Sequence, residues 1–281
     1  MRRPVLAVIG VLALTACGGQ PPATPSTTTT TTTSVSPVSS VPSVSPAPAT
    51  TPPPPVTTTT TVPPSKPVPV VVLDPGHNGA NAANPGEINR QVPAGRGRMK
   101  ACNTTGTATN AGYPEHAFTW DVAVRVRDQL AAQGVRVVLT RPDDNGVGPC
   151  VDRRAAIGNE SGAAAVVSIH ADGSTNPSAH GFHIAYSAPP LNEAQGEPSM
   201  RLATTMRDTL VAKGFATSTY IGSAGLSPRD DLGGLNLSER PAVLVECGNM
   251  RNATEAAAFS APDGRASYAA AITAGILAYL V

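Results

Sequence analysis

The feature that most constrains this chain is an abrupt change in composition near residue 66. Between Gly18 and Lys66 the sequence consists almost entirely of Pro, Thr, Ser, Ala and Val, and more than half of the 29 prolines lie before residue 69. A segment of this composition lacks the apolar side chains needed to form a core. We therefore predict a disordered linker over residues 18–66. Both a passive linker and a stalk fit its composition.

The N-terminus has the pattern of a secretory signal. Arg2 and Arg3 precede an apolar run over residues 5–14, which is shorter than the roughly 20 residues that span a bilayer. The run ends in Leu-Thr-Ala-Cys17-Gly, which resembles the lipobox of bacterial lipoproteins. We expect residues 1–17 to be a signal peptide with a lipobox. The alternative is an ordinary signal cleaved near Ala16.

This signal predicts an exported protein of the cell envelope. If Cys17 is lipidated, the chain is attached to the outer face of the plasma membrane, and otherwise it is secreted. The net charge is +1, and no basic stripe of the kind that binds a phosphate backbone is present. We therefore expect no nucleic-acid partner. We also expect a monomer, although no sequence pattern determines the oligomeric state.

Residues 67–281, about 215 in number, are sufficient for one sizeable core. Apolar runs of strand length alternate here with stretches of helical periodicity, and no internal repeat is visible. This order predicts a single α/β domain with a twisted, mostly parallel central sheet flanked by helices on both faces. We expect strands at 68–73, 135–140, 164–169, 181–187 and 242–246, and helices at 114–134, 152–160, 196–213 and 262–280. The stretch 78–113 is too long for an ordinary connection, so we expect it to be functional.

Four side chains capable of chemistry lie at the ends of these elements. His77 and His170 follow two predicted strands, Glu246 ends a third, and Glu115 lies in the first turn of the long helix. Strand carboxyl ends and the amino ends of the following helices share one edge of an open α/β sheet, so these groups should converge. Two imidazoles and one carboxylate form a catalytic zinc site that leaves a fourth position for water. A further carboxylate can then move the proton.

Several motifs, in this order, resemble those of the zinc-dependent N-acetylmuramoyl-L-alanine amidases of the amidase type 3 family. The resemblance covers essentially all of residues 68–281. It rests on Leu73-Asp-Pro-Gly-His77, Glu115, Arg154 with Asn159, Ser168-Ile-His170-Ala-Asp172, Leu235, Arg240-Pro-Ala-Val-Leu-Val and Val245-Glu-Cys-Gly-Asn249.

The resemblance implies that His77, Glu115 and His170 bind Zn²⁺ and that Glu246 is the general acid/base. It implies hydrolysis, by zinc-activated water, of the amide between the lactyl group of N-acetylmuramic acid and the L-alanine of the stem peptide. The substrate would be peptidoglycan or muropeptides. Two other functions stay open, namely a different zinc peptidase or amidohydrolase and a non-catalytic envelope-binding protein.

The chain departs from the family pattern at a few positions. Cys247-Gly-Asn stands where Gly-Phe is common, Gly158 replaces a common Ala, and the stretch 78–113 is long. These differences concern the substrate groove rather than the metal site.

Other residues that could compete for these roles have simpler interpretations. Glu87 and Glu160 match no motif, and we expect His116 to be a surface residue. His180 and His183 are expected to be structural or to lie at the rim, and Trp120 to pack in the core.

Cys102 and Cys150 both lie in predicted loops of an exported chain, which favours a disulfide between them. Cys247 ends a buried strand and is expected to be a free buried thiol.

Overall fold

The computed structural model describes residues 67–281, so the predicted signal peptide and linker lie outside the described residues. The strands are β1 Val70–Pro75, β2 Gln91–Pro93, β3 Met99–Ala101, β4 Arg136–Leu139, β5 Ala165–Asp172, β6 His183–Ser187, β7 Leu226–Arg229 and β8 Ala242–Asn249. The α-helices are α1 Pro85–Ile88, α2 Glu115–Ala132, α3 Val151–Glu160, α4 Glu197–Ala212, α5 Gly233–Asn236, α6 Ala253–Ser260 and α7 Pro262–Leu280. Two short 3-10 helices span Asn81–Ala83 and Glu193–Gln195.

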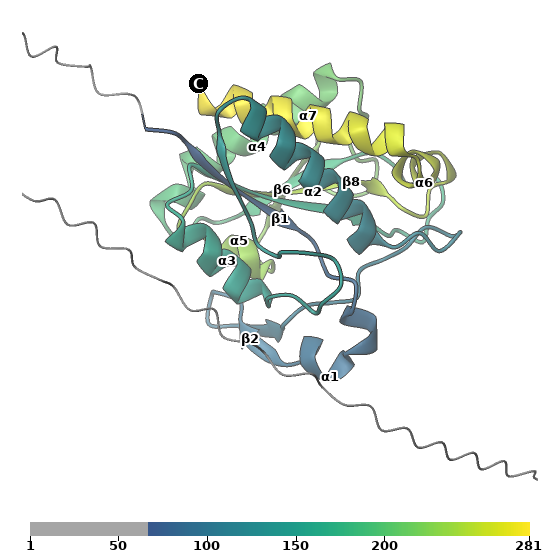
Figure 1. Ribbon diagram of the computed structural model, residues 1–281, viewed down its shortest axis with the longest axis horizontal. Helices are drawn as coiled ribbons and strands as arrows, with labels where there is room; N and C mark the ends of the chain where they lie inside the picture. Colours follow the sequence, from purple (N-terminus) through teal and green to yellow (C-terminus); the bar gives the residue numbers. More distant parts are fainter. Residues whose placement is uncertain (1–66) are drawn as a thin grey trace, which may run out of the picture. The chain divides into compact units, whose positions relative to one another are not determined.

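The central sheet has the strand order β4-β1-β5-β8-β6-β7, and helices cover both of its faces (Figure 1). β6 runs antiparallel to β8, and the other neighbouring strands of this sheet are parallel. The predicted α/β fold with a mostly parallel sheet is therefore confirmed. The parallel pairs bring the carboxyl ends of β1, β5 and β8 to one edge, where ligands bind in such sheets.

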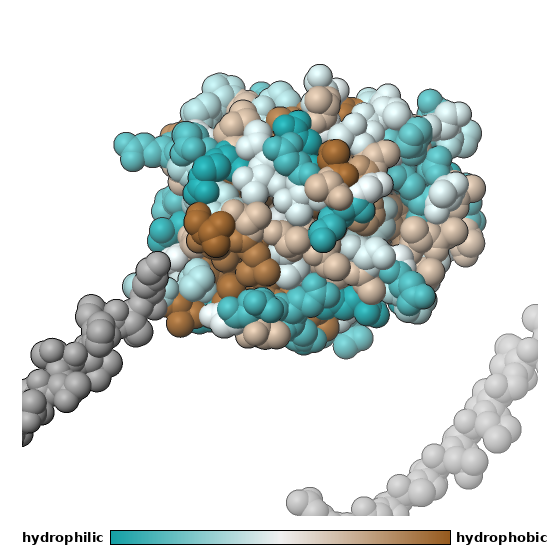
Figure 2. Space-filling model, turned by 90° about the horizontal axis from the view of Figure 1, so that it is seen from above, coloured by the Kyte–Doolittle hydropathy of each residue, from teal (hydrophilic) through white to brown (hydrophobic). Residues whose placement is uncertain are grey.

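Three long helices, α2, α4 and α7, cover one face of the sheet. On α2 the apolar residues recur every four positions, and Phe118, Val122, Val126 and Leu130 are all fully buried. They pack against the alternate residues of the strands, such as Leu73 and Ile169, in one large core. Figure 2 shows an outer surface of mixed polarity with one gathering of hydrophobic residues. No helix within residues 67–281 has the length and apolarity needed to cross a membrane.

The opposite face of the sheet is covered less completely, by the shorter helices α3 and α5 (Figure 1). A second and smaller apolar cluster lies on this face, formed by Val72, Ala163, Val166, Ala185, Leu235, Ala242 and Leu244. This arrangement leaves room for a groove between the sheet and α5.

The stretch 78–113 contains regular structure that the sequence pattern does not predict. β2 and β3 form an antiparallel hairpin, and three consecutive residues with positive φ, Gly95, Arg96 and Gly97, make its turn. Elements of three or four residues are too short to produce a hydrophobic period, which explains why they were missed.

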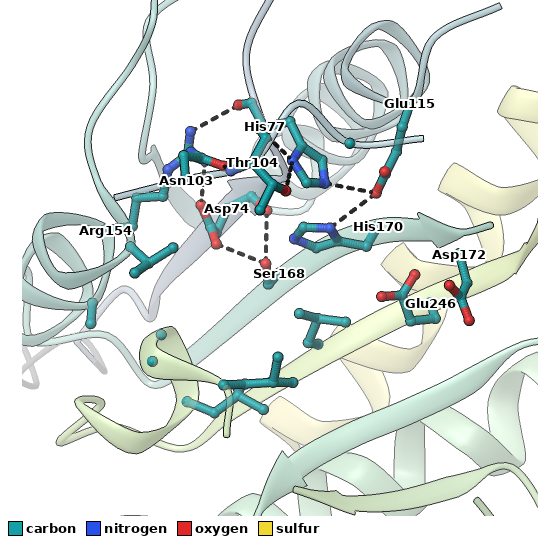
Figure 3. A pocket seen from close by; sticks show the side chains of 18 of the residues that line it. Asp74, His77, Asn103, Thr104, Glu115, Arg154, Ser168, His170, Asp172 and Glu246 are labelled. Atoms are coloured by element: carbon teal, nitrogen blue, oxygen red, sulfur yellow. Dashed lines mark hydrogen bonds and ion pairs between the residues drawn. The ribbon is translucent and has the colours of Figure 1, made fainter. Parts of the chain in front are cut away.

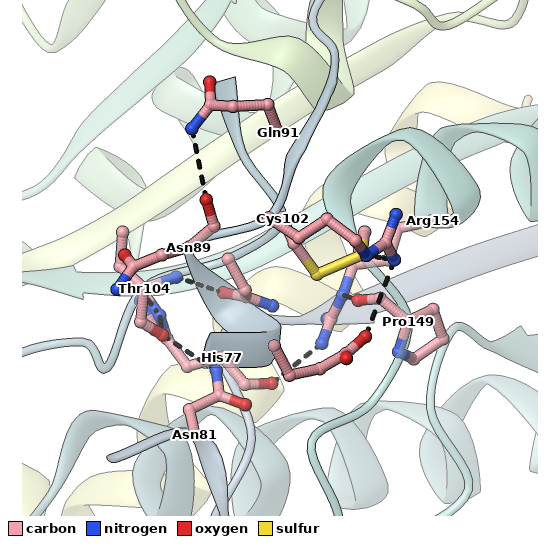
Figure 4. Close-up of a disulfide and its surroundings, with 12 residues drawn as sticks. His77, Asn81, Asn89, Gln91, Cys102, Thr104, Pro149 and Arg154 are labelled. Carbon is pink, nitrogen blue, oxygen red and sulfur yellow. Dashed lines mark hydrogen bonds and ion pairs between the residues drawn. A yellow bond between two sulfur atoms is a disulfide. The ribbon is translucent and has the colours of Figure 1, made fainter. Parts of the chain in front are cut away.

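The predicted disulfide is confirmed. Cys102 and Cys150 are bonded, with their Cα atoms 4.4 Å apart, and they join the end of the hairpin to the start of α3 (Figure 4). Both cysteines are buried with Val92 in a small apolar cluster. Cys247 is a buried free thiol, as expected.

Candidate metal centre and active site

His77 lies two residues beyond β1, in a tight turn. Its φ is 60°, and the preceding Gly76 donates a backbone hydrogen bond to the Ile169 carbonyl at 2.9 Å. A Cβ atom on Gly76 would lie 2.3 Å from Cε1 of His170, so only glycine fits between the two imidazoles. The Asp-Pro-Gly-His motif thus brings the ends of β1 and β5 into direct contact.

The predicted strand ends require a small correction. β5 continues to Asp172, so His170 lies inside this strand rather than after it, and β8 continues to Asn249, so Glu246 lies inside this strand rather than at its end. β5 and β8 stay paired beyond these two residues. His170 pairs with Glu246, the register then shifts, and Asp172 pairs with Asn249. The predicted convergence at one edge is unaffected.

The side chains of His77, Glu115 and His170 meet at one point (Figure 3). Glu115 Oε1 lies 3.1 Å from His77 Nε2 and 3.0 Å from His170 Nδ1, and the ligand atoms of all three residues lie within 4.8 Å of one another. Two imidazoles and a carboxylate with this spacing fit a catalytic zinc site, which needs three protein donors.

Hydrogen bonds orient His77 and Glu115, and Glu115 in turn contacts His170. His77 Nδ1 lies 3.1 Å from the Thr104 carbonyl, which can only accept, so Nε2 is left facing Glu115. Glu115 Oε1 accepts the Ala171 amide at 3.1 Å, and Oε2 accepts the Thr107 amide at 2.9 Å. The three side chains are therefore already held in the arrangement that a metal requires.

The electrostatics of the three donors are strongly coupled. Burial alone would raise the pKa of Glu115, but the adjacent His77 and His170 hold it well below its ordinary value. Burial alone would lower the pKa of His77, but the Glu115 carboxylate outweighs this and raises it. Glu115 is only 4 % exposed, so its charge must be balanced locally by positive charge.

Two buried arginines support the turn that contains His77. Arg154 donates to the carbonyl of His77 at 2.8 Å and to Asp74 Oδ1 at 2.8 Å. Arg141 donates to the Pro75 carbonyl at 2.9 Å and to the His116 carbonyl at 3.0 Å. Sequence reasoning missed Arg141, because a single arginine after a strand gives no local signal of burial.

Asp74 balances the charge of Arg154. Burial would raise the pKa of Asp74, but Arg154, together with hydrogen bonds from Thr140 and Ser168, lowers it to about 2. The result is an ionised, fully paired carboxylate behind the candidate metal centre.

Glu246 lies on the same face of the sheet, level with His170 on one side and with His183 on the other. Its Oε2 atom is buried and has no hydrogen-bond partner among residues 67–281. Burial raises the pKa of Glu246 well above its ordinary value, and the charges of Glu115 and Asp172 raise it further. Figure 3 shows the carboxyl groups of Asp172 and Glu246 beside each other. Sequence reasoning assigned no role to Asp172.

These residues line a cavity of about 420 Å³ that extends from the three donors across β5 and β8. Its lining near the centre is polar, and further along it includes Val166, Leu244 and the start of α5 at Gly233. Gly158 of α3, which replaces an alanine common in the family pattern, lies against this floor. A Cβ atom on Gly158 would lie 2.9 Å from Cγ2 of Val166. A groove with a metal centre at one end and an apolar floor suits an extended ligand.

The competing residues lie elsewhere. Glu87 does not join the three donors, and Glu160 bonds Arg153 on the exposed side of α3. His116 is not a free surface residue, because Nδ1 lies 2.7 Å from Asp144 Oδ2. His183 is buried at 1 % exposure, which fits the structural expectation rather than the rim. Trp120 is only partly buried, with the Arg141 guanidinium 4.9 Å from its ring centre.

Comparisons of the sequence and of the structure with known proteins all lead to the same family. A family model described as N-acetylmuramoyl-L-alanine amidase matches residues 71–278. The N-acetylmuramoyl-L-alanine amidase Rv3717 of Mycobacterium tuberculosis is 51% identical over 211 residues, which cover 75% of this chain and 86% of that protein.

The solved structures that resemble this chain include amidases of the same name. An N-acetylmuramyl-L-alanine amidase of Mycobacterium smegmatis has 55% identity and a TM-score of 0.73, covering 75% of this chain and 96% of that one. The corresponding amidase of Mycobacterium abscessus has 56% identity and a TM-score of 0.73, covering 76% and 99%. The chain therefore belongs to the amidase type 3 family.

Proposed function

We propose that this protein is a zinc-dependent N-acetylmuramoyl-L-alanine amidase that cleaves peptidoglycan or muropeptides between the lactyl group and L-alanine. The observation that carries the proposal is the convergence of His77, Glu115 and His170 in a cavity that Glu246 also lines, with its buried Oε2 unpaired among the described residues. Relatives with amidase names that align over three quarters of the chain support the reaction class.

In this proposal His77, Glu115 and His170 would hold Zn²⁺, which would polarise the amide carbonyl as a Lewis acid and activate water. Glu246 accepts a proton from the attacking water and returns it to the departing L-alanine nitrogen. A carboxyl group whose pKa is raised by burial suits this task, because it can hold the proton near neutral pH. Arg154 and Arg141 keep His77 in place throughout.

The reaction is tested by mass spectrometry of the products formed from purified muropeptides. The zinc-loaded protein should release intact stem peptides, a chelator should stop the release, and added zinc should restore it. Free peptides without the muramoyl group should not be cleaved, which separates an amidase from a zinc peptidase. Release of stem peptides that continues in chelator would contradict the zinc assignment.

The role of Glu246 is tested with Glu246→Gln, which keeps the shape of the side chain. We expect activity to fall by about 10²- to 10⁴-fold, the usual range for loss of a general acid/base. Glu160→Gln, on the exposed side of α3, is the matched control and should keep full activity. Full activity in Glu246→Gln would overturn the mechanism, and a protein that binds peptidoglycan without cleaving it would overturn the enzyme assignment.

We further propose that the protein acts in the cell envelope as a monomer, with the signal over residues 1–17, the linker over 18–66 and the catalytic domain over 67–281. The lipobox-like sequence at Cys17 supports attachment to the membrane by a lipid. Mass spectrometry of the mature N-terminus would detect a lipid on Cys17, and Cys17→Ala should release the protein into the medium. A mature N-terminus at or near Cys17 that carries no lipid would instead indicate ordinary secretion.

A further inference from the structure

One cation in the groove is not matched by a carboxylate. Lys100 and Arg154 are the basic side chains that line the cavity. Arg154 is paired with Asp74 at 2.8 Å. Lys100 Nζ contacts the backbone carbonyl of Asp231 at 3.1 Å, and within residues 67–281 it forms no ion pair. An ammonium group has three hydrogens to donate, so Lys100 can still bind an acceptor in the groove.

The carboxylates of Asp230 and Asp231, the residues beside the Lys100 contact, are already engaged by other cations. Asp231 accepts two hydrogen bonds from Arg229, each of 2.7 Å. Asp230 forms an ion pair with Arg98 at 3.1 Å. Hydrogen bonds from Arg229, and then its charge, lower the pKa of Asp231 more than Lys100 does, so the charge of Lys100 remains available to a ligand in the groove.

The backbone around Lys100 is held in place at both ends of the hairpin. Lys100 lies in the middle of β3, opposite Val92 of β2. At the turn, Arg96 donates hydrogen bonds of 3.1 Å to Asn236 of α5 and to Ser187 of β6. At the other end, the bond from Cys102 to Cys150 joins β3 to α3 (Figure 4). Lys100 thus extends from a fixed wall of the groove, as a residue that selects a ligand must.

We propose that Lys100 recognises a free carboxylate on the stem peptide and makes the enzyme prefer acidic stem peptides to amidated ones. This inference rests on the proposed function, because it places the scissile amide at the three donors and the peptide along the groove. The apolar floor at Val166 and Leu244 offers no other charge to such a peptide. A carboxylate gains a charge-assisted hydrogen bond from Lys100, whereas the corresponding amide offers only a neutral oxygen.

The test compares two synthetic substrates that differ in one group, N-acetylmuramoyl-L-alanyl-D-isoglutamate and its isoglutamine counterpart. With the zinc-loaded protein we expect kcat/KM to favour the carboxylate by about five- to tenfold, since Lys100 is partly exposed to solvent. Raising the ionic strength should reduce this preference. Calorimetry with zinc-loaded Glu246→Gln should give the same order of affinities without turnover.

Lys100→Met should lower the preference to about one by slowing cleavage of the acidic substrate alone, and Lys100→Arg should retain it. Lys213→Met is the matched control and should keep the preference, because Lys213 is an exposed lysine at the end of α4 and lies outside the lining of the groove. Thermal unfolding shows whether each variant is folded. An unchanged preference in Lys100→Met, or no preference in the unmodified protein, would overturn the inference while leaving the amidase assignment intact. Failure to cleave either substrate would overturn the proposed function and this inference with it.

Discussion

The two faces of the central sheet are built from the same strands and yet have different chemistry. Ile169 of β5 points to the face covered by α2, α4 and α7, and it is fully buried in the large core. The next residue, His170, points to the other face and meets Glu115. The period of two along a strand thus separates stabilising residues from candidate functional residues that are neighbours in sequence.

Because core residues and candidate functional residues lie on opposite faces of the sheet, we expect that stability and activity can be altered separately in this fold. The face under the long helices is predominantly apolar and holds the large core, with a few buried hydroxyl groups such as that of Thr273. The groove face combines a small apolar cluster with buried charges, held by Arg141, Arg154 and the disulfide. Substitutions under the long helices should therefore lower the free energy of unfolding with little effect on activity. Substitutions at the metal centre on the groove face should lower activity with little effect on the free energy of unfolding.

The largest effects are expected from the neighbouring pair Ile169 and His170. Ile169→Ala should reduce the free energy of unfolding by about 2–5 kcal/mol, because it opens a cavity in a closed core, while the folded fraction keeps its activity per molecule. His170→Ala should abolish zinc binding and activity with little loss of stability. Urea unfolding and metal analysis measure both. Equal loss of stability in the two variants would contradict the separation of the faces.

The disulfide tests what stabilises the rim of the groove. Cys102 and Cys150 close a loop with a sequence separation of 48. Replacing both by alanine should reduce the free energy of unfolding by about 4 kcal/mol in the chain-entropy model. Reduction of the unmodified protein should reproduce the loss in urea unfolding. Unchanged stability in both experiments would mean that packing alone holds the hairpin.

Asp74 gives the groove face a dependence on pH that the apolar face lacks. Its folded pKa of about 2 lies below the value of about 3.9 expected for an unfolded chain. The stabilisation, about 2 kcal/mol, is thus fully present above pH 4 and is lost as the pH falls towards 2. Asp74→Asn should be less stable than the unmodified protein at pH 7, and the gap should narrow at pH 2.5. A constant gap between these pH values would argue against this linkage.

Replacing Glu246 should have the smallest effect on stability. Unlike the replacement of Asp74, it should raise the stability of the metal-free protein. The folded pKa of Glu246 lies above its unfolded value, so the ionised form costs stability as the pH rises above the unfolded pKa. In metal-free protein, Glu246→Gln should therefore unfold a few degrees higher than the unmodified protein at pH 8, which corresponds to about 1 kcal/mol. Glu160→Gln serves as the exposed control. A lower unfolding temperature for Glu246→Gln would show that its carboxyl group is stabilising.

The sequence was sufficient to predict most of the long elements, the meeting of His77, Glu115 and His170, and the presence of Glu246 at the same edge of the sheet. Helix α2 and strands β1, β5 and β8 have strong apolar patterns, and His77, Glu115, His170 and Glu246 follow from their ends. The strands of the hairpin, α1, β7, α5 and α6 were missed, because none is longer than eight residues and such short elements establish no clear period.

The remaining contacts of the site depend on tertiary packing. The antiparallel direction of β6, the burial of Arg141 and the position of Asp172 beside Glu246 follow from elements far apart in the chain. No local pattern encodes them.

Gly76 has a consequence for the comparison of related chains. A methyl group at this position would occupy the space of the His170 ring, although every donor atom would still be present in the sequence. A chain with both histidines and the glutamate but a larger residue before the first histidine should therefore be an inactive member of the family. Gly76→Ala would provide such a protein by design, as a silent partner for experiments that need binding to the cell wall without its hydrolysis.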